Sequence, residues 1–272
     1  MAKPAKEISG DAMDLYLKDR VILVSGGAKG IGEAICRVLA AERAVPVVIG
    51  RNAADNDRVV AEIARSGSQA FAVNAELMRT EECLKAVATA KDRFGRIDGL
   101  VNNAGINDGV NLENGDTEKF LASLRKNLIH YYELAHFALP ELKQSRGAIV
   151  NIGSKVAETG QGGTSAYAAA NGGRNALTRE WAVELAKYGI RVNAVIVAEC
   201  WTPMYATWLS SQPDPAAARQ QIEQRIPLGR RMTTGDEIAH MVAFLLSDRS
   251  SHTTGQLIHV DGGYVHLDRA AT

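Results

Sequence analysis

Short apolar runs alternate with longer amphipathic stretches along most of this chain. The run "VILVS" (21–25) leads into a glycine turn and then a stretch with Ile31, Ile35 and Val38 at helical spacing. This alternation is typical of βαβ units, in which helices connect parallel strands. Uninterrupted apolar runs such as "VILV" and "AIVNI" indicate strands covered on both faces. We therefore predict an α/β fold: a single doubly wound, Rossmann-like domain whose seven-stranded parallel sheet is flanked by helices.

The remaining elements follow the same alternation. Strands are expected at 21–25, 45–50, 70–73, 97–103, 147–153, 190–197 and 255–260. Helical spacing of apolar residues predicts helices from residue 31 and at 58–67, 83–95, 117–144 and 165–188. No repeat or low-complexity linker divides the chain. Residues 15–272 are thus expected to form one domain, and residues 1–14 a flexible polar extension.

One segment, from about 199 to 234, interrupts the alternation. It contains "WTPMYATWLSSQPDPAAARQQ" and is rich in Trp, Pro and small polar residues. A long excursion after the sixth strand of such a sheet often covers a ligand at the carboxyl edge. We expect a substrate lid here; a surface loop without function is the alternative.

Composition excludes several classes of protein. Thirty-one basic residues balance thirty-one acidic ones among 272, which argues against a nucleic-acid or membrane surface. Three widely spaced cysteines do not suggest disulfides or a zinc site, so no metal is expected and a cytoplasmic location fits. No signal peptide or membrane helix is expected. The expected partners are small molecules and further copies of the chain.

The turn after the first strand reads "SGGAKGIG" (25–32). Its glycines allow a tight turn and bring backbone amides close to a phosphate, while the following helix N-terminus adds partial positive charge. Within a βαβ unit this turn predicts a dinucleotide site, although a plain strand-to-helix turn is the alternative. The expected cofactor-binding residues here are Gly26, Lys29, Gly30, Ile31 and Gly32.

The end of the second strand indicates which nicotinamide cofactor is used. An acid there would bind the ribose 2′-hydroxyl and repel a 2′-phosphate, but the chain reads "VVIGRN", with Gly50 and Arg51. Arg51 and Lys29 together favour NADP, with NAD as the second choice. Arg51 could instead be an ordinary solvated arginine.

Four further motifs complete the pattern: "NNAG" (102–105), Asn127 in "RKNLIHYY", Ser154 in "NIGS" and Tyr167 in "YAAAN". With the glycine turn, they resemble the short-chain dehydrogenase/reductase family from about residue 13 onward. The resemblance implies hydride transfer between a nicotinamide and an alcohol or carbonyl carbon. It implies that Ser154 binds the substrate oxygen, that Tyr167 transfers the proton, and that Asn127 helps to hold a relay water.

The same resemblance implies further cofactor contacts. Asn103, Ala104 and Gly105 would line the adenosine side, and Thr202 in "WTPM" would contact the nicotinamide carboxamide. Members of the family are often homotetramers. The Ala- and Gly-rich helix at 165–188 and the strand at 256–260 would then form subunit contacts.

Several segments, including "NLIHYY", "GQGGTSAY", "AECWTPMY" and "PLGRRMTTGDEIA", resemble the bacterial L-fucose (aldose) dehydrogenases, which oxidise a sugar to its lactone. A sugar site is compatible with the residues of the excursion, since aromatic faces pack on pyranose C–H groups and polar side chains bind hydroxyls. The candidate substrate residues are Glu199, Gln161, Asn107 and Trp201. For the aromatic residues, core or interface packing is an equal alternative.

The stretch "YAAAN" departs from the family pattern Tyr-x-x-x-Lys, because Asn171 stands at the lysine position. In the family the lysine holds the nicotinamide ribose and lowers the pKa of the tyrosine by its charge, and an amide can perform only the first task. A cation at ~4 Å in an effective dielectric of ~20 is worth up to about 4 kcal/mol. Asn171 is therefore predicted to weaken turnover and to displace its optimum to alkaline pH, with Asn171→Lys restoring neutral activity.

Two other functions remain open. The first is a dinucleotide-binding sensor or assembly protein that has lost catalysis, and the second is a reductase of another carbonyl compound. Ser154, Tyr167 and Asn127 favour an enzyme, because a pure binding protein does not need an ordered proton relay.

Overall fold

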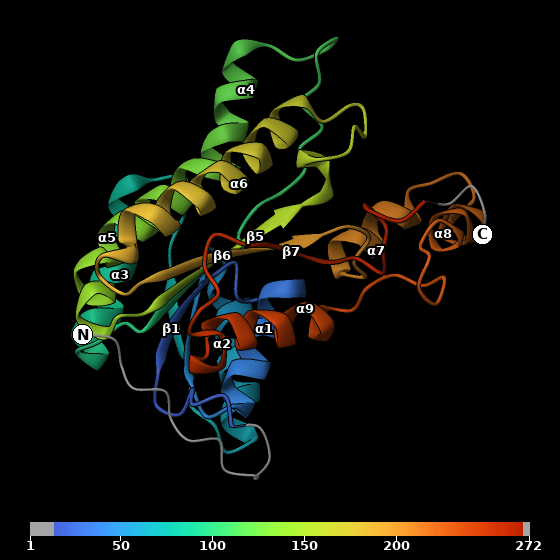
Figure 1. Cartoon of the computed structure of the whole chain (residues 1–272). Coiled ribbons are helices and arrows are strands. Elements are labelled where there is room, and N and C mark those ends of the chain that lie inside the picture. The colour runs from blue at the N-terminus through green and yellow to red at the C-terminus, as the bar shows by residue number, and fades with distance from the viewer. Residues whose placement is uncertain (1–13, 269–272) are drawn as a thin grey trace.

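A single parallel sheet organises the chain (Figure 1). The computed structural model describes residues 14–268, so the first 13 residues of the predicted extension lie outside it. All strand pairs are parallel, which confirms the predicted seven-stranded sheet. The spatial order is β3 (Phe71–Asn74), β2 (Val45–Gly50), β1 (Val21–Ser25), β4 (Gly99–Asn102), β5 (Ala148–Ser154), β6 (Arg191–Val197) and β7 (Leu257–Val260).

Helices cover both faces of the sheet (Figure 1). One layer contains α1 (Gly30–Ala41), α2 (Ala53–Arg65) and α9 (Gly235–Leu246), and the other contains α3 (Thr80–Phe94), α5 (His130–Ser145) and α6 (Ser165–Ala186). None of the described helices combines the length and the apolar character that a membrane span requires.

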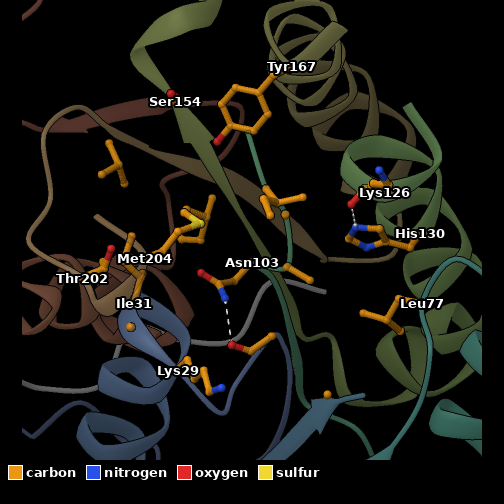
Figure 2. A pocket seen from close by; sticks show the side chains of 18 of the residues that line it. Lys29, Ile31, Leu77, Asn103, Lys126, His130, Ser154, Tyr167, Thr202 and Met204 are labelled. Atoms are coloured by element: carbon orange, nitrogen blue, oxygen red, sulfur yellow. Dashed lines mark hydrogen bonds between the residues drawn. The ribbon is translucent and has the colours of Figure 1, made fainter. Parts of the chain in front are cut away.

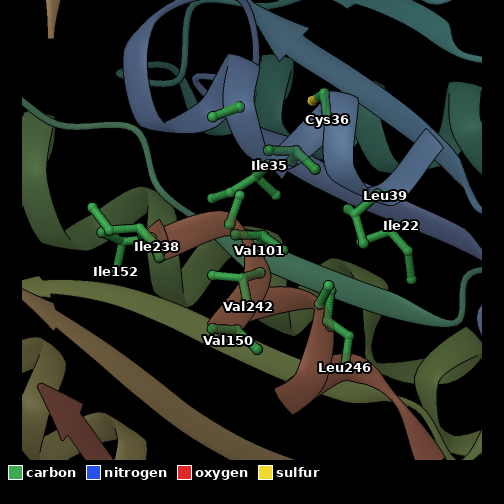
Figure 3. Close-up of a cluster of buried hydrophobic side chains, with 14 of the residues drawn as sticks. Ile22, Ile35, Cys36, Leu39, Val101, Val150, Ile152, Ile238, Val242 and Leu246 are labelled. Atoms are coloured by element: carbon green, nitrogen blue, oxygen red, sulfur yellow. The ribbon is translucent and has the colours of Figure 1, made fainter. Parts of the chain in front are cut away.

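Strand side chains alternate between two hydrophobic cores. In β1, Ile22 and Val24 face the layer of α1, α2 and α9, whereas Val21 and Leu23 face α3, α5 and α6. Figure 3 shows the first core, where Ile22 lies among side chains of α1 and α9. This double burial explains the uninterrupted apolar runs, since each successive side chain meets a covered face.

The predicted helix at 117–144 contains an irregularity. It is built from α4 (Thr117–Leu124), a π-helical turn η1 (Arg125–Ile129) and α5, in direct succession. Such π turns inside helices are often found at functional sites. Here the turn carries Asn127.

The strand order places a site at one edge of the sheet. From β1 the chain proceeds to β2 and β3 on one side, then crosses back to β4 on the other. Loops leaving β1 and β4 therefore diverge and leave a crevice at the carboxyl ends of the strands. Ligands of open α/β sheets bind at such switch points.

The excursion at 199–234 contains α7 (Pro203–Ser210) and α8 (Pro215–Gln224). A parallel bridge joins Cys200 to Thr233 at its base. The Trp201 amide donates to the Thr233 carbonyl, and the Thr233 amide donates to the Glu199 carbonyl, each at 2.9 Å. The two ends of the excursion thus leave and rejoin the domain side by side.

Candidate active site

A cavity of about 690 Å³ occupies the crevice at the carboxyl ends of the strands. This size is within the range of roughly 300–1,000 Å³ for small-molecule sites. Segments that follow six of the strands line it, together with η1 and the start of the excursion. The lining includes Gly26, Lys29, Gly30, Ile31, Arg51, Asn103, Ala104, Gly105, Ser154, Tyr167 and Thr202, all of which are predicted cofactor or catalytic residues.

The glycine turn gives this cavity an anion-binding end. Helix α1 begins at Gly30, and the side chain of its N-cap residue Lys29 forms no capping hydrogen bond. A Cβ on Gly32 would lie 2.1 Å from the Gly26 carbonyl oxygen, so only glycine permits this close approach. Free backbone N–H groups and the helix dipole at this end fit the phosphates of a dinucleotide. Gly32 itself lies behind the cavity wall.

The end of β2 excludes an acidic residue at position 50. A Cβ on Gly50 would lie 2.6 Å from Oδ1 of the buried Asn56. Asn56 cannot move aside freely, because its Nδ2 donates to the Gly50 carbonyl (2.9 Å) and to Asn74 Oδ1 (2.7 Å). The missing acid is therefore a consequence of packing at this strand end.

The two predicted cofactor cations each have an acidic neighbour. Lys29 forms an ion pair with Asp55 at 2.7 Å, and Arg51 lies 3.8 Å from Glu76. Both Lys29 and Arg51 are mostly exposed, so these pairs are weak and open to competition by a ligand phosphate.

The turn after β4 is held against the glycine turn by Ser25. Its hydroxyl accepts hydrogen bonds from the amides of Asn103 (2.9 Å) and Ala104 (3.1 Å). Asn103 Nδ2 donates in return to the Ser25 carbonyl at 2.9 Å. This exchange fixes the turn that carries the "NNAG" motif, which is predicted to line the adenosine side.

Ser154 and Tyr167 lie together at the other end of the cavity. In Figure 2 the Tyr167 hydroxyl points from α6 toward the end of β5, where Ser154 lies. Ser154 caps the short 3-10 helix η2 (Lys155–Ala157), with its hydroxyl accepting from the Val156 amide at 3.5 Å. A hydroxyl that can hold an oxygen and a phenol that can exchange a proton thus line the same cavity.

Asn171 lies directly below Tyr167 in α6 and is fully buried. Its Nδ2 donates to the Tyr167 carbonyl at 2.9 Å, and its Oδ1 accepts from Nη1 of Arg174 at 3.1 Å. Asn171 does not line the cavity, whereas Arg174 does. From the sequence, Arg174 is a candidate to lend charge in place of the missing lysine, but it was not expected in the site because it does not stand four residues after Tyr167.

Asn127, in the π turn, is held by hydrogen bonds of both its side chain and its backbone. Its Oδ1 accepts from the Ile106 amide (2.8 Å), its Nδ2 donates to the Ser123 carbonyl (3.0 Å), and its own carbonyl accepts from Arg174 Nε (2.7 Å). The Asn127 carbonyl, which the π turn aims toward α6, is therefore occupied by a guanidinium.

His130 is a further lining residue that sequence reasoning missed. It is fully buried, and its Nε2 lies 2.9 Å from the Lys126 carbonyl (Figure 2). Burial, together with the charge of Arg174, lowers the pKa of His130 to about 3. The imidazole is thus neutral at physiological pH and adds no charge to the cavity.

The four predicted substrate residues are described, and none of them lines the cavity. Glu199 forms an ion pair with Lys155 and accepts from the Tyr205 hydroxyl at 2.7 Å. Trp201 packs its ring under Arg219, 4.5 Å from the guanidinium carbon. Asn107 and Gln161 are exposed on loops.

Tyr205 connects this cluster to the cavity. Its ring lines the cavity, while its hydroxyl reaches Glu199. Burial and the neighbouring carboxylate raise the pKa of Tyr205. The ring of Tyr264 also covers the Lys155 ammonium at 4.1 Å. A partly buried polar cluster therefore stands behind the Tyr205 side of the cavity.

Thr202, at the start of the excursion, lies against the glycine turn. It caps α7 by accepting from the Tyr205 amide at 3.2 Å. A Cβ on Gly30 would lie 3.4 Å from the Thr202 Cβ, so α7 begins against the start of α1.

One group of possible metal ligands lies outside the cavity lining. The ligand atoms of Glu158, His259 and His266 lie within 4.8 Å of one another, and His259 Nε2 is 3.1 Å from Glu158. The sequence analysis, which expects no metal, did not identify this group, because Glu158 lies 101 residues before His259 in the chain.

Comparison with protein-family models finds one match over most of the chain. A family described as enoyl-(acyl carrier protein) reductase matches residues 26–265. The match extends from the glycine turn to the segment after β7 and so includes the whole cavity.

Individual relatives align over nearly their full lengths. A 3-oxoacyl-(acyl-carrier-protein) reductase of Thermotoga maritima is 36% identical, over 92% of this chain and 100% of its own. An L-fucose dehydrogenase of Bos taurus is 33% identical, over 96% of this chain and 95% of its own. Among solved structures, the Cj0485 dehydrogenase has a TM-score of 0.90 and 43% identity, with 95% of this chain and 98% of that one covered.

Proposed function

The chain belongs to the short-chain dehydrogenase/reductase family of NAD(P)-dependent oxidoreductases, and from this premise we propose that it oxidises an aldose such as L-fucose to its lactone with NADP. The observation that carries the proposal is that Ser154 and Tyr167 line the same cavity as the glycine turn. A proton-transfer pair and a phosphate-binding end are thus joined across one site.

The residues divide the chemistry between them. When bound, the nicotinamide supplies the hydride acceptor. Ser154 holds the substrate hydroxyl oxygen, and Tyr167 takes its proton as the carbon–oxygen double bond forms. The buried Asn102 and Asn151 keep α6 in place: Asn102 Nδ2 donates to Asn151 Oδ1 (3.0 Å), and Asn151 Nδ2 donates to Thr178 on α6 (2.9 Å).

The preference for NADP rests on the end of β2. Arg51 lines the cavity there and can pair with a 2′-phosphate, while Gly50 has no room for the acid that would repel one. The nearby Glu76 moderates this preference, so NAD is a slower alternative rather than an excluded one.

A polyhydroxylated substrate is supported by the polar cluster beside Ser154. Lys155 directly follows Ser154 and is paired with Glu199, which also accepts from the Tyr205 hydroxyl, and of these three residues Tyr205 lines the cavity. A site built to bind hydroxyl groups rejects analogues that lack them, because its buried polar groups would remain unpaired. Similarity to an L-fucose dehydrogenase at 33% identity supports the same class of substrate.

The test is a steady-state assay of the purified protein with L-fucose and either NADP or NAD, with Tyr167→Phe as the matched inactive control. Lactone formation that requires Tyr167 and proceeds with lower KM for NADP supports the proposal. Turnover of 3-oxoacyl compounds in the reductive direction, with none of aldoses, would instead assign a carbonyl reductase. Cofactor binding without turnover of either class would favour a binding protein.

A homotetramer is part of the proposal. Tyr132 on α5 and Val183 on α6 are large apolar residues that are 53% and 79% exposed, which suits a contact with a second copy. Light scattering measures the assembly directly. A lower molar mass for Val183→Glu than for the unaltered protein would support a subunit contact through α6. An unchanged molar mass would contradict such a contact.

A further inference from the structure

Arg174 is a buried cation in the cavity wall. It is 3% exposed and lies seven residues after Tyr167, two turns along the same face of α6. Its guanidinium carbon is 5.9 Å from the centre of the Tyr167 ring and 4.3 Å from that of Tyr131. The charge therefore lies beside the residue that transfers the proton.

Neutral acceptors alone bind this guanidinium. Nε donates to the Asn127 carbonyl (2.7 Å), and Nη1 donates to the Ile152 carbonyl and to Asn171 Oδ1 (both 3.1 Å). Among residues 14–268, no carboxylate forms an ion pair with it, and Nη2 has no hydrogen-bond partner. Burying a cation without an anion is costly, and such groups cluster at functional sites.

The unpartnered Nη2 lies where the backbone leaves room for it. A Cβ on Gly105 would be 2.8 Å from Nη2 and 2.9 Å from Asn127 Oδ1. Both Gly105 and Arg174 line the cavity. One N–H edge of the guanidinium is thus buried at the cavity wall without a hydrogen-bond partner, so its charge is not offset there.

The other ionisable groups in the elements around this part of the cavity cannot supply the same charge. His130 and Tyr131 on α5 are buried and neutral, Lys126 in η1 is paired with Asp108 at 3.2 Å, and Lys155 in η2 is paired with Glu199. At the far end, the lining cations Lys29 and Arg51 also have acidic neighbours. Within residues 14–268, Arg174 is thus the cation of the cavity lining that has no acidic partner.

We propose, resting on the oxidoreductase function above, that Arg174 is the positioning cation of the Tyr167 proton transfer and replaces the lysine that this chain lacks at 171. Its charge stabilises the deprotonated Tyr167, and Asn171 orients it by accepting from Nη1. The cation thus stands seven residues after the tyrosine, in the second helical turn, instead of four residues after it, in the first.

This arrangement changes what a lysine at 171 would do. Asn171→Lys would remove the acceptor of Nη1 and place an ammonium beside a buried guanidinium. The single variant is therefore expected not to restore activity. The double variant N171K/R174Q, in which the charge is moved rather than duplicated, is expected to keep near wild-type behaviour.

The deciding experiment measures ionisation of Tyr167 without any substrate. Tyrosinate absorbance is followed against pH, and the Tyr167 contribution is isolated by subtracting the same protein carrying Tyr167→Phe. In R174Q the midpoint is expected to rise by about one to two pH units, from Coulomb attraction at roughly 6 Å in an effective dielectric of about 20. R174K and N171K/R174Q, which retain one cation, are expected to keep the wild-type midpoint.

The exposed Arg179 on the same helix provides the matched control, since R179Q should leave the midpoint unchanged. An unchanged midpoint in R174Q would overturn the proposal. If R174Q does not fold, a midpoint in N171K/R174Q below that of the wild type would overturn the proposal, because the lysine would then add a charge without replacing one, and a wild-type midpoint there would support it. A shifted midpoint in protein that does not oxidise aldoses would sustain the role of Arg174 while refuting the proposed substrate.

Discussion

The side-chain oxygen of Asn171 accepts a 3.1 Å hydrogen bond from Nη1 of Arg174, so a neutral amide orients the buried guanidinium beside Tyr167. The amide nitrogen of Asn171 is used as well, as it donates to the Tyr167 carbonyl at 2.9 Å. Asn171 therefore connects the proton-transferring residue to the charge next to it. We infer that Asn171 supports catalysis only while the charge of Arg174 is not neutralised by an anion.

An Asn171→Asp substitution tests this dependence. The carboxylate would pair with Arg174 and cancel its charge without changing the size of the side chain. We expect kcat at pH 7 to fall at least tenfold, while the new ion pair keeps the thermal midpoint within a few degrees. Measurement of kcat from pH 6 to 10, with calorimetry on both proteins, checks this. Full activity at pH 7 in a stably folded variant would contradict it.

Arg51 is expected to determine cofactor choice. Arg51→Ala removes the cation at the end of β2, so KM for NADP should rise by about 10- to 100-fold while KM for NAD changes little. Arg65→Ala, at an exposed position of α2, is the control and should leave both constants unchanged. If Arg51→Ala changed the KM for NADP and the KM for NAD by the same factor, Arg51 would not contact the 2′-phosphate.

His130 is expected to make stability depend on pH. Because burial lowers its pKa to about 3, the folded protein stays unprotonated there while the unfolded chain gains a proton below about 6.5. The free energy of unfolding should thus fall as pH falls, by about 2 kcal/mol between pH 7 and 5. Urea unfolding of His130→Gln should lack this decrease. The exposed His240→Gln variant should retain it.

The Lys155–Glu199 pair is expected to contribute to stability through the cost of separating it. Glu199→Gln leaves a mostly buried ammonium without its anion, which should lower the free energy of unfolding by about 2–4 kcal/mol. Adding Lys155→Met should recover much of this loss. Asp116→Asn, in an exposed pair with Lys119, should cost less than about 1 kcal/mol. Equal losses for Glu199→Gln and Asp116→Asn would contradict the assigned burial.

The three cysteines are expected to be unreactive in the folded protein. All are buried, and burial raises the pKa of Cys83 and Cys200 to about 12 and that of Cys36 further. The thiolate is the reactive form. Ellman's reagent at pH 8 should therefore modify no thiol natively and three in denaturant. Rapid modification of one thiol in the native protein would reveal local opening around it.

The order of strands and helices could be predicted from the sequence because each element carries its own pattern. Continuous apolar runs indicated covered strands, and the glycine turn after the first of them indicated a phosphate-binding end. The confirmed parallel sheet follows from these local signals. Boundaries were less accurate, since α2 begins at Ala53, where Asn52 accepts from the Asp55 amide, rather than at 58.

The interior of the site depended on contacts between distant segments. Spacing alone did not indicate that Arg174 points toward Tyr167, because the carbonyls that fix it come from Asn127 and Ile152. The environment of Glu199 likewise depends on Lys155, which lies in another loop. The steric exclusion of an acid at Gly50 required the position of Asn56.

The bridge between Cys200 and Thr233 has a consequence for how this scaffold can diversify. Since the excursion departs and returns at one point, the part of it that follows the cavity-lining residues Thr202 and Tyr205 behaves as an exchangeable segment. Insertions, deletions or wholesale replacement there leave the strand register and the glycine turn untouched. New specificities can thus be acquired in a single segment, while the hydride-transfer apparatus is inherited intact.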